Sequence, residues 1–89
     1  MGKMLCPVDV ISLCEADGQI RPLRVRFQDG DQVYQKFDID RVIQRDQIRF
    51  VGAEAELFLC SATLGEKSFL IWLKYSLRSH SWCITGKLY

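Results

Sequence analysis

Residues 23–28, LRVRFQ, alternate strictly between apolar and polar side chains. Successive residues of a β-strand point to opposite faces of a sheet, so this period of two predicts a strand with one buried and one solvent-facing side. Runs rich in Val, Ile, Phe, Leu, Trp and Tyr recur along the chain, separated by the turn-like sequences ADGQ, DGDQ, LGEK and RSHS. This spacing predicts an all-β fold of about six or seven antiparallel strands, arranged as consecutive hairpins in a small curled sheet or partly open barrel.

The length of 89 residues fits one small domain, residues 1–89. No segment approaches the roughly 18 apolar residues of a membrane span, and the N-terminal sequence MGKMLCPVDV lacks the apolar run of a signal peptide. We therefore expect a cytoplasmic protein. The net charge of +1 argues against a protein dedicated to nucleic acid, which usually has a clear basic excess.

The first predicted hairpin turns at the sequence DGD. A two-residue loop at Asp29-Gly30 would bring Val33 and Phe37 to the side of the arginines, whereas a loop of three or five residues unites the apolar faces. We favour the odd loop, because burying the apolar side chains on one face outweighs the turn preference of Asp-Gly. The predicted buried face consists of Leu23, Val25, Phe27, Val33, Phe37 and Ile39.

The following segment, IDRVIQRDQIRFV, is compatible with two structures. Its apolar residues roughly follow a helical stripe that Asp38 or Asp40 could cap. The alternative is a strand bent by a bulge near Asp40 and Arg41, followed by a polar turn at residues 45–47 and a short strand to Val51. We favour strands, because Ile and Val suit strands better and the segment is short for a helix.

The C-terminal third predicts two further hairpins. A two-residue loop within LGEK pairs Phe58 with Leu73, and a loop at RSHS pairs Leu77 with Trp82. The reverse face also carries several apolar residues, which indicates a curled or closed sheet. The predicted core face consists of Phe58, Cys60, Phe69, Ile71, Leu73, Tyr75, Leu77, Trp82, Ile84 and Leu88.

The polar face of the first hairpin is a candidate binding site, formed by Arg24, Arg26, Tyr34 and Lys36. Guanidinium groups bind phosphate in a bidentate manner, and an aromatic ring beside them could stack on a base. The simpler interpretation, which we favour, is a solvated strand face where Asp38 makes weak surface ion pairs.

A second candidate site surrounds Trp72. The predicted register sets Trp72 opposite Lys87, with Lys74 nearby. An exposed tryptophan flanked by cations is typical of a platform for a partner protein or a nucleic-acid strand. Alternatively, another part of the chain covers Trp72 and the lysine stems pack over it.

The sequence predicts no metal site, no cofactor and no enzymatic activity. Structural zinc sites usually use close cysteine pairs such as C-x2-C, and no two of the four cysteines are that close. His80 is the only histidine, and no further group is apparent that would orient it to activate a thiol such as Cys83.

Two segments resemble small uncharacterised bacterial all-β domains. In those domains a Tyr-containing strand, a polar turn and a W-x-[LI] strand close the sheet, as in YSLRSHSWCITGKLY, and the opening hairpin has the layout of RPLRVRF and VYQKFDIDRVI. The resemblance covers residues 20–89 and implies no catalytic residue. Some such domains are encoded beside DNA-damage polymerases, which favours a nucleic-acid context.

Together these features predict a non-catalytic binding module. The partner we favour is a protein, because the charge is nearly balanced, and nucleic acid bound by the Arg24 and Arg26 face is the alternative. We expect a monomer or weak homodimer without membrane contact.

Overall fold

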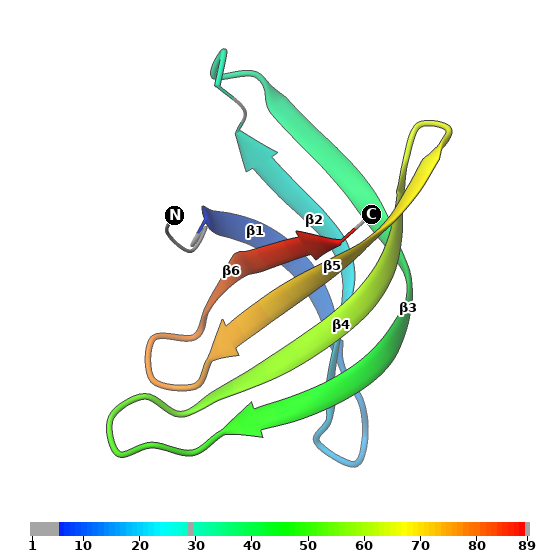
Figure 1. Ribbon diagram of the computed structural model, residues 1–89. Coiled ribbons are helices and arrows are strands. Elements are labelled where there is room, and N and C mark those ends of the chain that lie inside the picture. The colour runs from blue at the N-terminus through cyan, green and yellow to red at the C-terminus, as the bar shows by residue number, and fades with distance from the viewer. Residues whose placement is uncertain (1–5, 29, 89) are drawn as a thin grey trace.

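The computed structural model describes residues 6–28 and 30–88, with side chains described to residue 86. All regular structure in these ranges is β-strand, and the strands form a closed barrel in which each strand pairs with its sequence neighbours (Figure 1). The all-β class and the construction from hairpins are therefore confirmed, with full closure of the sheet. Within these ranges no helix has the length and apolar character needed to cross a membrane. The strands are β1 (Cys6–Cys14), β2 (Ile20–Gln28), β3 (Tyr34–Ile48), β4 (Ala55–Leu64), β5 (Lys67–Ser76) and β6 (Ser81–Leu88).

The barrel closes where β1 pairs with β6, through the partners Cys6↔Ile84, Pro7↔Cys83 and Val8↔Trp82. The β2–β3 and β4–β5 turns lie at the same end as the start of β1 and the end of β6, and we call this the upper end (Figure 1). The β1–β2, β3–β4 and β5–β6 turns lie at the lower end. We distinguish the two ends because side chains fill the barrel interior more completely at the lower end than at the upper end.

The β2–β3 hairpin confirms the odd loop. Gln28 pairs with Tyr34 across a five-residue loop, and Val25 pairs with Phe37, so the two apolar faces meet inside the barrel. The expectation that Val33 is buried is wrong, because Val33 belongs to this loop and is 54% exposed.

Leu23 also differs from its predicted position. A bulge between β1 and β2 makes Leu23 an extra residue, since Ile11 pairs with Arg24 and Ser12 already pairs with Pro22. One extra residue reverses the direction of the side chains beyond it. Pro22 is consequently buried, and Leu23 is exposed.

Strand β3 resolves the ambiguous middle segment. It is a single strand, which excludes the helix, and it contains the predicted bulge at Asp40. A second bulge lies at Ile43, between the pairs Val42↔Cys60 and Gln44↔Leu59. The predicted turn at residues 45–47 is wrong, because the two bulges bend the long strand around the barrel without interrupting its pairing.

The β4–β5 register is the one expected, with Phe58 opposite Leu73. The β5–β6 register is shifted by two residues, because Tyr75 rather than Leu77 pairs with Trp82. A shift of two preserves the buried faces but leaves Leu77 in the turn, where it is 41% exposed.

The core occupies the barrel interior, and its lower part is the more completely filled. The ring centroids of Phe58 and Trp82 lie 5.4 Å apart, and the ring centroids of Trp82 and Tyr75 lie 4.9 Å apart. Arg45 extends across this end, with its guanidinium 5.2 Å from the Phe58 ring and its Nη1 donating to the carbonyl of Ile20 at 2.8 Å. The buried apolar side chains are Val25, Phe37, Ala55, Phe58, Cys60, Ala62, Ile71, Leu73 and Trp82.

Candidate functional site

The first candidate site lies on the outer surface of β1, β2 and β3. Because these strands alternate, the side chains between the buried residues of β2 and β3 point to solvent. The register places Arg24 opposite Asp38, and Arg26 opposite Lys36. Tyr34 begins β3 on the same face and is 59% exposed. The structure thus brings together all four residues that the hairpin pattern predicts. We call this surface the hairpin face.

Both arginines of the hairpin face are paired with carboxylates. Arg24 Nε donates to Asp38 Oδ1 at 2.7 Å, and Arg26 Nη2 donates to Asp9 Oδ2 at 2.6 Å. All four side chains are about half exposed or more, so solvent screens the attraction and each pair contributes little to the stability of the fold. The main effect of the pairs is to fix the direction of the guanidinium groups.

Arg26 is held by more than one contact. Its Nε also donates to Asp9 Oδ2, at 3.0 Å, and its guanidinium carbon lies 4.7 Å from the centroid of the Tyr34 ring. The hydrogen bond from Arg26 to Asp9 and the charge of Asp9 raise the pKa of Arg26, so the guanidinium stays charged. Arg24 is held only through Nε within the described residues, which leaves its two terminal amino groups for a ligand.

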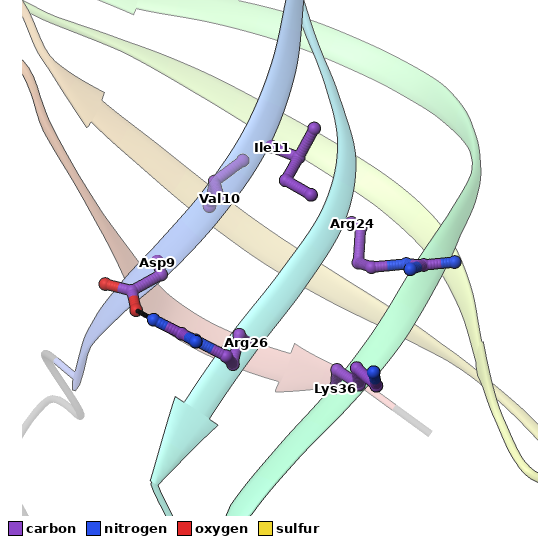
Figure 2. A pocket seen from close by; sticks show the side chains of 6 residues that line it. All are labelled: Asp9, Val10, Ile11, Arg24, Arg26 and Lys36. Atoms are coloured by element: carbon purple, nitrogen blue, oxygen red, sulfur yellow. Dashed lines mark hydrogen bonds and ion pairs between the residues drawn. The ribbon is translucent and has the colours of Figure 1, made fainter.

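Two hollows adjoin on the hairpin face. Figure 2 shows the first, of about 360 Å³, with Arg24, Arg26 and Lys36 around it and Ile11 on its β1 side. The second, of about 510 Å³, shares Arg24 and Lys36 and continues towards Thr63 on β4. Because the two hollows share Arg24 and Lys36, they adjoin across four strands, and we call them together the trough.

Sequence reasoning missed the contribution of β1 to this site. Asp9 anchors Arg26, and Ile11 is 61% exposed beside the cations. The signal was present, because Asp9 and Ile11 are alternate residues of a strand and so share one face. Their position next to the arginines depends on the β1–β2 register, which contains a bulge that no sequence pattern indicates.

The second candidate site lies on the other side of the molecule. In a closed order of six strands β5 is opposite β2, so Trp72 and Lys74 do not join the hairpin face. Trp72 is half-buried on the outer surface, pairs with Leu59 on β4, and has its Cδ1 atom 3.9 Å from the position of a Cβ on Gly86. The ring therefore lies beside the bare backbone of Gly86, an arrangement that compensates for a glycine in a strand.

The predicted pairing of Trp72 with Lys87 is wrong. A bulge in β6 makes Thr85 an extra residue, so Trp72 pairs with Gly86 and Ile71 pairs with Lys87. The side chain of Lys87 lies outside the described residues. Lys74 is half-buried and pairs with Leu57 and Cys83.

The cysteines are dispersed over the barrel. Cys60 is fully buried, Cys6 and Cys83 are half-buried, and Cys14 is exposed. Burial raises the pKa of the Cys60 thiol to about 12, partly offset by the positive charge of Arg45. His80 contacts the hydroxyl of Tyr75 through Nδ1 at 3.1 Å, and no group of three metal-ligating side chains occurs among the described residues.

Comparison with protein-family models, curated proteins and solved structures finds no match for this chain. The resemblance of residues 20–89 to small bacterial β-domains therefore stays a hypothesis.

Proposed function

We propose that the protein is a non-catalytic binding module that holds a segment of a partner protein on the hairpin face. The observation that carries this proposal is the trough formed by the two adjoining hollows around Arg24 and Lys36. A barrel wall with directed cations and an exposed aliphatic side chain offers both affinity and orientation without any chemical step.

The charge of the trough favours a protein over nucleic acid. Its basic residues are Arg24, Arg26 and Lys36, and its acidic residues are Asp9, Asp38 and Asp40, so the formal charges cancel. Phosphate backbones are held by a surplus of positive charge, which this surface lacks. A protein segment can present charges of both signs and match such a surface residue by residue.

The contacts suggest the chemistry of the segment. Lys36 has no ion-pair partner among the described residues, and Arg24 keeps two amino groups without a hydrogen bond there, so together they can bind a carboxylate. Ile11 offers an apolar contact within the same hollow. The expected ligand is therefore a peptide segment that combines Asp or Glu with an aliphatic or aromatic side chain.

A selection from a random peptide library on the immobilised protein tests this proposal. Sequences with an acidic residue near an apolar one should be enriched, and Lys36→Glu should weaken their binding about tenfold, because it replaces an attraction by a repulsion. Lys74→Glu is the matched control, since Lys74 lies on the opposite wall, and it should have no effect. Enrichment of basic peptides, or equal losses in both variants, would overturn the proposal.

Single-stranded nucleic acid is the second candidate, favoured by one contact. The guanidinium of Arg26 stacks on Tyr34, and an exposed aromatic ring beside a cation can stack on a base. Because Trp72 and Trp82 lie away from the hairpin face, a labelled oligonucleotide followed by fluorescence anisotropy is the suitable assay. Binding that falls steeply with salt, and is lost in Tyr34→Ala, would favour nucleic acid over a protein partner.

A further inference from the structure

The upper end of the barrel contains an apolar cavity that is separate from the hairpin face. Its volume is about 310 Å³, and every strand contributes to its wall. The cavity therefore opens along the barrel axis, inside the ring of strands. Among its lining residues are Cys6 of β1, Phe27 of β2, Phe37 of β3, Leu64 of β4, Phe69 of β5 and Ile84 of β6.

The cavity exists because the two ends of the barrel are filled differently. At the lower end Phe58 and Trp82 fill the interior, and the solvent-exposed Arg45 places its guanidinium against the Phe58 ring. At the upper end the phenylalanines pack against one another along part of the wall, with ring centroids 5.9 Å apart for Phe27 and Phe37 and 5.1 Å apart for Phe37 and Phe69. No described side chain crosses this end as Arg45 crosses the other, so the phenylalanine wall stays available to an apolar ligand.

One charged side chain lines the cavity among the described residues, and it is Lys67. Lys67 begins β5 opposite Leu64 and is an even number of residues from Phe69 and Ile71, so it faces the same side of the strand as they do. It makes no ion pair with any described residue, and no carboxylate is found in the described lining. An ammonium group at the edge of an apolar chamber complements a ligand with an anionic head and an apolar body.

We propose that this cavity binds a small amphipathic anion, specifically a medium-chain aliphatic carboxylate, with its chain against the phenylalanines and its carboxylate at Lys67. The volume of about 310 Å³ lies at the lower end of the range of roughly 300–1,000 Å³ for small-molecule pockets, which suits a ligand as small as octanoate. The cavity lies inside the barrel and the hairpin face on its outer surface, and Phe37 is the residue that lines both the cavity and the second hollow within the described residues.

Isothermal titration of the full chain with octanoate tests the proposal. We expect a dissociation constant of about 1 mM or tighter, with about fivefold weaker binding of 1-octanol, which lacks the charge. Lys67→Gln should weaken octanoate about fivefold and leave 1-octanol unchanged, whereas Lys74→Gln, on the outer surface of the same strand, should change neither. No octanoate binding up to about 10 mM, or equally strong binding of octylammonium, would overturn it.

Cysteine alkylation locates the ligand. Cys6 lines the cavity, and Cys14 lies at the other end of the same strand, so octanoate should slow the reaction of Cys6 with iodoacetamide and leave Cys14 unaffected. Peptide mass spectrometry reads the two rates in one sample. Equal protection of both thiols, or of neither at saturating octanoate, would contradict the location of the site.

Discussion

Gly18 gives the β1–β2 turn a backbone conformation that other residues adopt at a cost. Its φ is +90°, and it closes a short loop in which Gly18 N donates to the carbonyl of Glu15 at 2.8 Å. A Cβ there would meet no atom within 4 Å, so the cost of Gly18→Ala is conformational and about 1 kcal/mol. Gly30→Ala is the control, because its surroundings are equally open and its φ lies outside the left-handed region. Urea unfolding that shows equal losses in both variants would contradict this account.

Because the thiol of Cys60 is buried, we expect the free energy of unfolding to depend on pH. Its pKa is raised by burial from an ordinary value of 9.0 to about 12. Above pH 9 the unfolded chain loses the proton while the folded chain keeps it, so the stability that is fully present below pH 9 decreases as the pH rises towards 12. Urea unfolding at about pH 8 and about pH 11 should show a larger loss for the wild type than for Cys60→Val. Identical losses would mean that the thiol does not contribute.

At the scale of single residues, the sequence predicts which side chains share a face of a strand more accurately than it predicts which side chains are buried. The alternation of β2 and β3 places Arg24, Arg26 and Lys36 together, as observed. Leu23 and Val33 follow the same alternation but are exposed, one because of a bulge and the other because of a longer loop. A shift of one residue in the pairing register turns the side chains of a strand to the opposite face of the sheet. The free-energy difference between the two registers arises from contacts between strands that are distant in the sequence.

At the scale of elements, the structural role of Arg45 depends on its position in β3 and is not evident from its neighbours in the sequence. In RDQ it reads as part of a polar turn, but on β3 it pairs with Phe58 and spans the lower end of the barrel. Arg45→Met should destabilise the protein by about 1–2 kcal/mol, through the lost hydrogen bond to Ile20 and the lost contact with the Phe58 ring.

The control for this prediction is Arg49→Met. Among the described residues, the guanidinium of Arg49 donates hydrogen bonds only to Gln47, two residues earlier. Its replacement should cost less than about 0.5 kcal/mol in thermal or urea unfolding. A loss for Arg45→Met as small as that for Arg49→Met would show that the lower end is not held by this residue.

Elements were predictable where turn chemistry and apolar pairing agree. The β4–β5 hairpin satisfies both, because Gly65 has φ +64° at the first position of a two-residue loop and Phe58 then meets Leu73. The bulges at Asp40, Ile43 and Thr85 follow from the curvature that closure of the barrel requires. Apolar residues on both faces indicate a curled or closed sheet, but no local pattern gives the bulges at Ile43 and Thr85, so the continuous β3 and the partner of Trp72 could not be derived from the sequence.

For the whole molecule, the seam between β1 and β6 is the weakest part of the closed sheet. Among the described residues it contains three residue pairs, and Pro7 in the middle pair has no N–H to donate, whereas β4 is paired along its length on both sides. Amides of the seam should exchange with solvent at least about tenfold faster than those of β4, as measured by NMR hydrogen exchange. Seam amides protected as strongly as those of β4 would contradict a local opening at this position.

Closure of the barrel also separates the possible binding surfaces. The hairpin face, the outer surface around Trp72 and the upper cavity lie on different parts of one wall. The sequence predicted the residues of the hairpin face but not its separation from Trp72, which depends on β2 and β5 being opposite in the closed order. Ligands on the hairpin face and around Trp72 are therefore expected to bind independently.

The most direct test of the central claim is an NMR titration of the labelled protein with a peptide from the library selection. We expect chemical-shift changes at the amides of β1, β2 and β3 around Ile11, Arg24 and Lys36, with no change around Trp72. Lys36→Glu should remove these changes at the same peptide concentration, while Lys74→Glu should retain them. Shift changes confined to β5 and β6, or unchanged by Lys36→Glu, would contradict the assignment of the hairpin face as the binding surface.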